Sequence, residues 1–229
     1  MKLKKIDKKK LCLAFDGLSA SGKSLGAKLI SRKYNLNLLN SGLLYRYAAY
    51  LIIKNKPKRK ISFLKKKFTK LNYKYLTSLN LHSEEISNYV AIIAKQKKVR
   101  LILKEYQKKF AKKFKRIAIE GRDISTKILN KNPRYDVAFF FKCNLNTAAY
   151  RRWMDLKTSN KHITLDEIKK SLKKRNELDV KRRFSPLIQS KDSIIIRTDI
   201  LNKKAMVAKM SMEIEKKLLL KYGRYYKTR

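Results

Sequence analysis

The stretch Gly17-Leu18-Ser19-Ala20-Ser21-Gly22-Lys23-Ser24 matches G-x-x-x-x-G-K-[ST] at every fixed position. It follows a short apolar run, 11–15, and precedes a helix-like run, 25–34. The two glycines let the backbone curl so that several N–H groups face one concavity, and the helix adds the positive end of its dipole. The sequence therefore predicts a nucleoside triphosphate site over residues 17–25, Leu25 included, with Lys23 on the phosphates and Ser24 on Mg²⁺.

The composition is that of a folded but very basic chain. It has 229 residues, of which 44% are hydrophobic, enough for one sizeable domain, and its formal net charge is +43. Such a charge is typical of proteins that bind nucleic acid or a membrane surface. Here the basic residues are spread along the whole chain and accompany abundant Asn, Ile and Tyr, as an AT-rich coding sequence would produce. We therefore attribute most of the charge to the amino-acid bias of the coding sequence and not to a binding surface. Such a charge also attracts small polyanionic substrates.

The cysteines and histidines give no metal or disulfide pattern. Cys12 and Cys143 lie in separate apolar runs without a C-x-x-C partner, and His82 and His162 are isolated. Free thiols in a reducing cytoplasm are expected, and no zinc site is readable. The basic start, 1–10, is followed by too short an apolar run for a signal peptide. No run approaches the ~18 apolar residues of a membrane span, so we expect a cytoplasmic protein without a membrane partner.

Short apolar strands alternate with helical segments along the chain, which predicts an α/β fold built on a doubly wound, parallel, five-stranded sheet flanked by helices. The expected strands are 11–15, 36–39, 117–119, 137–141 and 193–196. The expected helices are 25–34, 43–53, one long helix from Ser83 to about 114, 146–156, 164–181 (with Thr164 as N-cap and Glu167 completing a capping box) and 203–222. Residues 61–83 stay ambiguous: 61–68 favours a helix, whereas 73–81 allows a strand.

Polar constellations follow several of these strands, where a parallel sheet places its ligands. After the second strand, Ser41 at a helix start can receive an acceptor group, and Arg46 can direct its guanidinium at a phosphate. After the third comes Glu120-Gly121-Arg122-Asp123, whose adjacent Arg and Asp suit a phosphate and a base edge. A helix cap with a surface arginine, and a local ion pair, are the ordinary alternatives for these two sites.

Two arginine clusters flank the polar stretch 157–162. Arg151 and Arg152 lie on one helix, and Arg175, Asp179 and Arg182 are spaced i, i+4, i+7 on or just after the next. This arrangement is typical of a lid that closes over phosphates, although in so basic a chain a solvated helix face is the alternative.

The motifs GLSASGKS, NSGLLYR, VR, EGRD, RRWM and RNELDVKRRFSPL occur in an order that resembles the bacterial cytidylate kinase family, from about 11 to 219. The resemblance implies a P-loop nucleoside monophosphate kinase that uses ATP and Mg²⁺ to phosphorylate CMP and dCMP. It also implies a single domain over 1–229, with a core over 11–222, a small monophosphate-binding insert over 55–100 and a lid over 151–182. We expect a monomer.

The resemblance assigns a role to each site residue. Residues 17–25 would bind ATP together with Arg151 and Arg152, with Ser24 on the metal. The cytosine would be recognised by Ser41, Arg100 and Asp123, the monophosphate held by Arg46, Arg122 and Arg182, the sugar contacted by Arg175 and Asp179, and the lid arginines would be Arg151 and Arg152. Of these, Lys23, Arg122, Arg151 and Arg182 would be catalytic. An aspartate suits cytosine because the N4 amino group is a donor that needs an acceptor.

The chain departs from the family pattern at five positions and in one segment. This chain has Asn40 where the family usually has Asp, Leu25 where it has Thr, and Ala91 where it has a base-contacting Ser. It also has Lys97 in place of Pro and Ser125 in place of Gly. Residues 55–83 form a shorter insert than is usual. These departures bear on base selectivity and the insert rather than on the phosphate machinery.

Two alternatives remain open. One is the same fold acting on another acceptor, such as AMP, UMP or dTMP. The other is a P-loop protein that binds nucleic acid through its charge. The sequence gives the second little support, because Asn130-Lys131 is followed by Asn132-Pro133 rather than a guanine-reading aspartate, and no RNA-binding aromatic motif is visible. We therefore expect no specific nucleic-acid partner.

Overall fold

The computed structural model describes residues 9–157 and 163–223. The predictions made for the basic start up to residue 8 and for most of the polar stretch, 158–162, lie outside the described residues. The chain divides into two compact units, one formed by Met1–Leu38 with Lys115–Arg229 and the other by Leu39–Phe114.

The predicted five-stranded parallel sheet is confirmed. Its order is β2-β3-β1-β4-β5, and its strands are β1 (Leu11–Gly17), β2 (Asn37–Asn40), β3 (Arg116–Glu120), β4 (Val137–Lys142) and β5 (Ile194–Arg197). β1 pairs in parallel with β3 on one side and β4 on the other, and β4 pairs in parallel with β5. The chain thus changes sides at β1, which makes the carboxyl end of β1 the point where such a sheet binds ligands.

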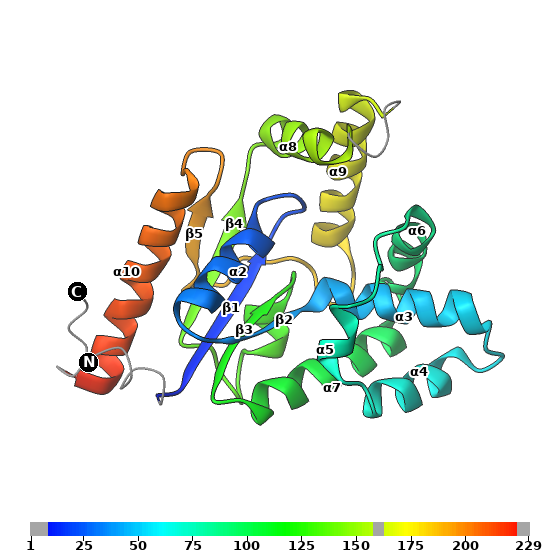
Figure 1. The fold of residues 1–229 in the computed structure, drawn as a ribbon, viewed down its shortest axis with the longest axis horizontal. Coiled ribbons are helices and arrows are strands. Elements are labelled where there is room, and N and C mark those ends of the chain that lie inside the picture. Colours follow the sequence, from blue (N-terminus) through cyan, green and yellow to red (C-terminus); the bar gives the residue numbers. More distant parts are fainter. Residues whose placement is uncertain (1–8, 158–162, 224–229) are drawn as a thin grey trace. The chain divides into compact units, whose positions relative to one another are not determined.

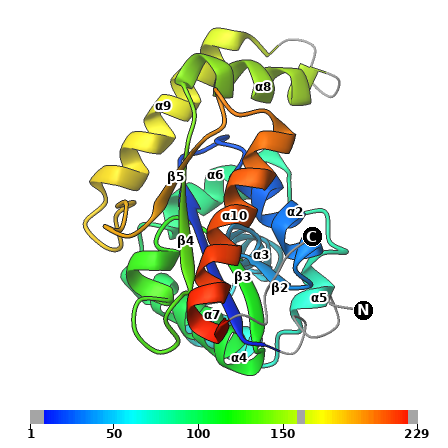
Figure 2. The same cartoon turned by 90° about the vertical axis from the view of Figure 1, so that its left-hand side faces the viewer.

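The core of the first unit lies between the sheet and two helices, α2 (Lys23–Lys33) and α10 (Lys203–Tyr222), which cover the same face of the sheet (Figures 1 and 2). Phe15, Phe139 and Phe141 are almost completely buried there. Burial of one such side chain stabilises the fold by about 2 kcal/mol. Gly26 allows the close approach of α2, because a Cβ at this position would lie 2.7 Å from the Phe141 ring.

A second cluster of the first unit joins α8 (Leu145–Lys157) to α9 (Leu165–Lys181), the two helices that follow β4 along the chain (Figure 1). Its buried residues are Ala148, Ala149, Ile168 and Leu172, and Ala20 of the phosphate loop packs against them. The predicted capping box is confirmed: the Glu167 amide donates to Thr164 Oγ1, and the Thr164 amide donates to Glu167 Oε2. The packing of Ala20 therefore ties α8 and α9 to the phosphate loop.

The second unit is helical, with α3 (Ser41–Asn55), α4 (Lys60–Thr69), α5 (Tyr73–Leu76), α6 (Glu84–Ile93) and α7 (Lys97–Lys113). The strand alternative for 73–81 is wrong. The Asn72 side chain caps α5 by accepting from the Lys74 amide, and the Thr77 hydroxyl bonds back to the Lys74 carbonyl. Such local side-chain bonds compete with a strand ladder, and the segment forms a helical turn instead.

The predicted single helix from Ser83 to 114 is also wrong, because it is broken between Ile93 and Lys97. The expected start at Ser83 is confirmed, because its hydroxyl caps α6 by accepting from the Ile86 amide. The break turns Gln96 to an extended conformation. Arg100 Nη1 then donates to the Ala94 carbonyl, so that part of the lost backbone bonding is replaced by a side chain.

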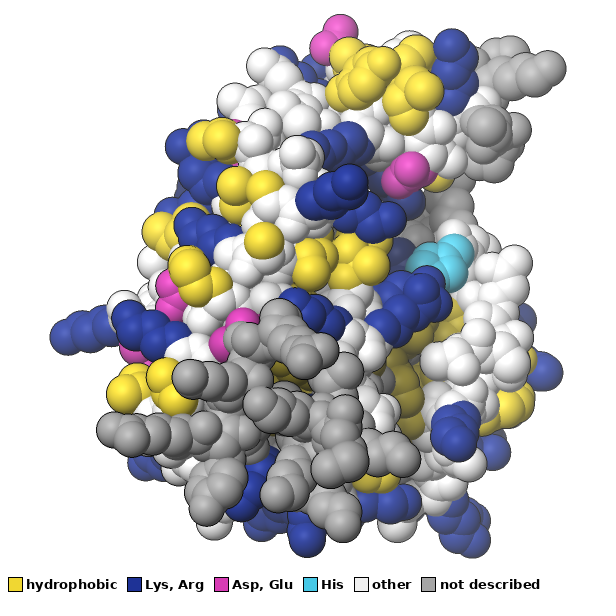
Figure 3. All heavy atoms as spheres, turned by 60° about the vertical axis from the view of Figure 1, so that its left-hand side comes forward, with side chains coloured by type: hydrophobic (Ala, Val, Ile, Leu, Met, Phe, Trp, Pro, Cys, Tyr) yellow, Lys and Arg dark blue, Asp and Glu magenta, His cyan; other side chains and the backbone are white. Residues whose placement is uncertain are grey.

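Basic side chains are dispersed over the surface rather than gathered in one patch on the face shown in Figure 3. Acidic side chains are few there, as the composition requires. Among the described residues, no helix combines the length and apolarity needed to cross a bilayer.

Candidate active site

The phosphate loop connects β1 to α2 and is curled by left-handed backbone at two positions. Ala20 has φ 55° and Gly22 has φ 73°. The Ser21 hydroxyl donates to the Leu18 carbonyl at 2.8 Å and closes the loop on itself. The Leu18 amide donates to the Phe141 carbonyl at 3.2 Å, which anchors the loop to β4. The predicted strand, loop and helix are therefore all present.

Lys23 and Ser24 both reach Glu120 at the end of β3. Lys23 Nζ lies 3.3 Å from Glu120 Oε2, and Ser24 Oγ donates to the same oxygen at 2.6 Å. Lys23 and Glu120 are buried. Burial lowers the pKa of Lys23, Arg122 lowers it further, and Glu120 partly offsets both. A buried cation with a depressed pKa gains when an anion arrives, which is what a phosphate site requires.

The residues beside Lys23 also fit a magnesium ion. Ser24 and Glu120 supply a hydroxyl and a carboxylate oxygen, which are hard ligands of the kind that Mg²⁺ prefers. No cluster of three or more His, Cys, Asp or Glu side chains able to hold a metal occurs in the described part of the chain. Mg²⁺ commonly takes one or two protein ligands and completes its shell with water and substrate phosphates, so this small set is sufficient.

Asp179 organises two of the predicted phosphate-binding arginines. Its carboxylate accepts from Arg122 Nε at 2.8 Å and from Arg182 Nη1 at 2.9 Å. Arg182 lies just past the end of α9, where the extended backbone turns its side chain back toward Asp179. Arg122 Nη2 also donates to Ser19 Oγ of the phosphate loop at 3.1 Å. Two guanidinium groups are thus held next to the loop in one orientation.

Asn176 and Thr198 contact the phosphate loop although the sequence did not point to either. Asn176 Oδ1 accepts from the Ser19 amide at 2.9 Å, and Thr198 Oγ1 donates to the Ser21 carbonyl at 3.0 Å. Arg151 donates to both the Thr198 carbonyl and its hydroxyl. Their positions were the one sequence feature that could have identified them, because Asn176 directly follows Arg175 and Thr198 directly follows β5.

Asp16 is a buried carboxylate that fixes the backbone after Asp123. It accepts from the amides of Ile124 and Ser125 at 2.8 and 2.7 Å, and from the Ser125 hydroxyl at 2.7 Å. Burial raises the pKa of Asp16, while these hydrogen bonds oppose the rise. Asp123 is itself buried, immediately before the π-helical turn η1 (Ile124–Ile128). The departure at Ser125 is therefore explained, because its hydroxyl gives Asp16 a further donor.

In the second unit, the three predicted substrate residues each have partners there. Ser41 Oγ accepts from the buried Gln107 Nε2 at 2.6 Å, a contact that the sequence did not predict. Arg46 Nη1 donates to the Leu81 carbonyl and to Ser87 Oγ, both at 3.0 Å. Arg100 is buried and lies over the Tyr45 ring, 5.5 Å from its centroid.

Within the first unit, the structure brings one subset of the predicted residues together. Lys23, Ser24, Arg122, Asp179 and Arg182 form one connected cluster in the first unit. Four other predicted residues of the first unit are exposed: Leu25, Arg151, Arg152 and Arg175. Three further predicted residues belong to the second unit: Ser41, Arg46 and Arg100.

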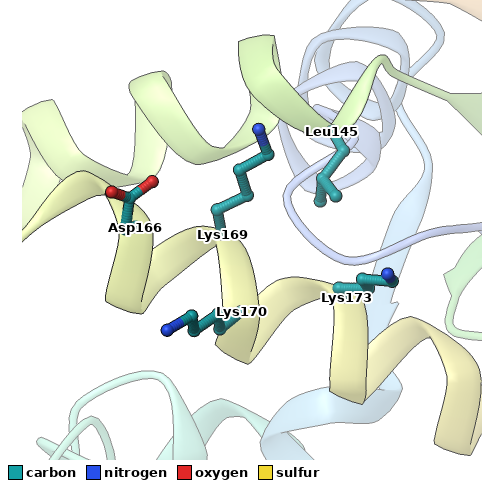
Figure 4. Close-up of a pocket in the computed structure, with 5 residues that line it drawn as sticks. All are labelled: Leu145, Asp166, Lys169, Lys170 and Lys173. Atoms are coloured by element: carbon teal, nitrogen blue, oxygen red, sulfur yellow. The ribbon is translucent and has the colours of Figure 1, made fainter.

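A separate pocket of about 350 Å³ lies between the first turn of α8 and the first half of α9. It is lined by Leu145, Asp166, Lys169, Lys170 and Lys173, with Lys169 projecting toward α8 (Figure 4). None of these residues is among the predicted site residues.

The parallel sheet, the phosphate loop and the ordered arginine cluster together define a P-loop nucleoside monophosphate kinase. The cytidylate kinase family matches residues 13–216 of this sequence. The chain belongs to the cytidylate kinase family.

Relatives of known name agree with this assignment. The chain is 32% identical over 222 residues to the cytidylate kinase of Mesomycoplasma hyopneumoniae strain 7448, covering 92% of this chain and 96% of the relative. It is 31% identical to the cytidylate kinase of Clostridioides difficile strain 630, covering 82% and 90%. A crystal structure of an uncharacterised protein from Eubacterium ventriosum shares the fold, with a TM-score of 0.54, 16% identity and coverage of 91% of this chain and 99% of that one.

Proposed function

We propose that this enzyme transfers the γ-phosphoryl group of ATP to CMP and dCMP, producing ADP and CDP or dCDP. One observation carries the proposal: Lys23 is buried beside a loop of backbone amides, and Asp179 orients Arg122 and Arg182 next to that loop. Cations held in a fixed geometry at a phosphate site are the main requirement for phosphoryl transfer. The names of the relatives, all cytidylate kinases, support cytosine nucleotides as acceptors.

Each residue of the cluster has a distinct task in this proposal. The loop amides and Lys23 bind the triphosphate, and Ser24 with Glu120 would hold Mg²⁺, which neutralises charge on the phosphates. Arg122 and Arg182 bind the acceptor phosphate and stabilise charge as it shifts between the two nucleotides. Arg151 and Arg152, on α8, would complete this shell. No covalent intermediate is needed, because an oxygen of the acceptor phosphate attacks the γ-phosphorus in line.

For the acceptor, we propose that Asp123, Ser41 and Arg100 recognise cytosine, while Arg46 supports the monophosphate. Asp123 can accept from the exocyclic N4 amino group, which uracil lacks. Arg175 and Asp179 are proposed on the sugar side. We propose in addition that residues 151–182 act as a lid and 55–100 as the monophosphate insert, and that the enzyme is a cytoplasmic monomer.

A second acceptor remains a candidate because of one residue. Ala91 stands where the family pattern has a base-contacting serine. The loss of one hydroxyl can relax discrimination between bases, so UMP, AMP or dTMP are the competing acceptors.

The direct test identifies the product. The enzyme is incubated with ATP, Mg²⁺ and CMP, and CDP is quantified by chromatography. Lys23→Met should lower the rate at least about 100-fold, as expected for loss of a preorganised charge at the transferring phosphate. Lys33→Met is the matched control, since Lys33 lies at the other end of α2 with a side chain that is 46% exposed. Near-normal turnover of Lys23→Met would contradict the proposal.

A further inference from the structure

The buried hydroxyl of Thr198 connects the phosphate loop to Arg151. Thr198 follows β5 and is 4% exposed. Its amide donates to the Lys142 carbonyl at 3.1 Å, so its backbone is fixed by the end of β4. Its Oγ1 donates to the Ser21 carbonyl at 3.0 Å, and Arg151 Nη1 donates to the same Oγ1 at 3.3 Å. Thr198 therefore touches the loop from one side and the arginine from the other.

The chemistry of the partners fixes the direction of these hydrogen bonds. A guanidinium group can only donate and a peptide carbonyl can only accept. The single hydroxyl proton of Thr198 must therefore point at the Ser21 carbonyl, and its lone pair must face Arg151. Such a chain of donors and acceptors polarises in one direction, from Arg151 to the loop.

The bond to the Ser21 carbonyl also sets the direction of a neighbouring amide. A peptide group is planar and trans, so the Gly22 N–H points away from the Ser21 carbonyl. A fixed carbonyl thus fixes the N–H of the residue directly before Lys23. Gly22 and Ala20, the residue before Ser21, both have positive φ, and the bond from Thr198 anchors the Ser21–Gly22 peptide from outside the loop.

The methyl group of Thr198 contributes packing at the same place. A Cβ added to Gly22 would lie 3.3 Å from Thr198 Cγ2 and 3.6 Å from its Oγ1. The hydroxyl of Thr198 therefore bonds to the loop, and its methyl group lies next to the position that a Gly22 side chain would occupy.

We propose that Thr198 is a positioning residue for ATP binding, which holds the Ser21–Gly22 peptide in its phosphate-binding orientation and links that orientation to Arg151. The inference rests on the proposed binding of a nucleoside triphosphate by the loop, but not on the identity of the acceptor.

The test uses three substitutions in the whole enzyme. Thr198→Val keeps the shape and removes the hydroxyl, Thr198→Ser keeps the hydroxyl and removes the methyl, and Thr126→Val is the control. Thr126 Oγ1 is buried and has no hydrogen-bond partner in the described part of the chain, so its loss removes a buried hydroxyl without breaking a bond to the loop.

The dissociation constant of ATP–Mg²⁺ is measured by titration calorimetry, together with the KM values for both substrates. Thr198→Val should weaken ATP binding and raise the KM for ATP about tenfold, the effect of one buried hydrogen bond, while the KM for CMP changes less than about twofold. Thr198→Ser should restore ATP binding to within about threefold of the wild type.

Two results would overturn the inference. One is unchanged ATP affinity in Thr198→Val. The other is a non-specific loss, in which Thr198→Val weakens the use of ATP and CMP equally and to the same extent as Thr126→Val. Because ATP binding is measured without an acceptor, failure of CMP as a substrate would reject the proposed function and leave this result interpretable.

Discussion

Lys23 Nζ lies 3.3 Å from Glu120 Oε2, and the side chains of both residues are less than a tenth exposed. The pair joins the first turn of α2, which follows β1, to the end of the neighbouring parallel strand β3. A buried lysine is tolerated there because its counterion is buried beside it. The same pair gives the site a pH dependence that can be measured.

Glu120→Gln should shift the pH profile of stability. The folded-state pKa of Lys23 is lowered, so between that pKa and its ordinary value of 10.5 the unfolded chain binds the proton and the folded chain does not. The free energy of unfolding therefore rises with pH in this window. Because Glu120 raises the pKa of Lys23, its removal lowers that pKa further and the rise begins at lower pH.

Urea unfolding from pH 7 to 10.5 measures this profile. Glu105→Gln is the control, because Glu105 forms an exposed i,i+4 pair with Lys109. Parallel profiles for wild type and Glu120→Gln would show that the two charges are not coupled.

Asn176→Ala should tighten the binding of ATP. The Ser19 amide, a donor of the phosphate loop, already donates a hydrogen bond to Asn176 Oδ1 at 2.9 Å. A phosphate that uses this amide must displace the Asn176 side chain, so its removal should lower the dissociation constant for ATP–Mg²⁺ about three- to tenfold. Asn202→Ala, which removes the N-cap of α10, should cost stability without affecting ATP. Weaker ATP binding in Asn176→Ala would mean that Asn176 helps to form the site instead.

Asp179→Asn should impair use of the acceptor. The carboxylate accepts from Arg122 and Arg182, whereas an amide can accept from one and presents its NH₂ group to the other. We expect kcat/KM for CMP to fall about 10- to 100-fold and stability to fall by about 1–2 kcal/mol. Asp192→Asn is the control, because Asp192 pairs with Arg134 on the surface and should change neither. Unchanged kcat/KM in Asp179→Asn would mean that the orientation of Arg122 and Arg182 by Asp179 does not matter for binding the acceptor.

Gln107→Glu should reduce discrimination between cytosine and uracil. Gln107 Nε2 donates to Ser41 Oγ at 2.6 Å, which leaves the Ser41 proton for an acceptor such as cytosine N3 or O2. A carboxylate only accepts, so it would draw this proton away. The ratio of kcat/KM for CMP to that for UMP should fall about tenfold, the value of one hydrogen bond. Gln96→Glu adds the same charge at an exposed position before α7. An equal change in both variants would point to charge alone.

The fold and the phosphate loop were predictable because their signals are local. Apolar runs such as 137–141 and the spacing of Gly17, Gly22 and Lys23 can be read from a few neighbouring residues. The failures also have local causes: backbone bonding by Thr77 and Ser78 overrode a strand-like alternation, and a short break at 94–96 interrupted a continuous helical pattern.

The residues that support the site were not predictable from the sequence. Asn176 meets Ser19 across 157 positions, and Thr198 meets Ser21 across 177. No periodicity or motif relates residues so far apart. Arg122 and Asp179 were both selected as candidates, but their pairing appears only in three dimensions.

The most direct measurement of the central claim is the release of ADP from ATP–Mg²⁺ with each of CMP, dCMP, UMP, AMP and dTMP. We expect strong stimulation by CMP and dCMP alone, with kcat/KM for the other three lower by a factor of about 100 or more. Equal or greater stimulation by another monophosphate would move the acceptor while leaving the fold intact. Absence of stimulation by all five would contradict the account.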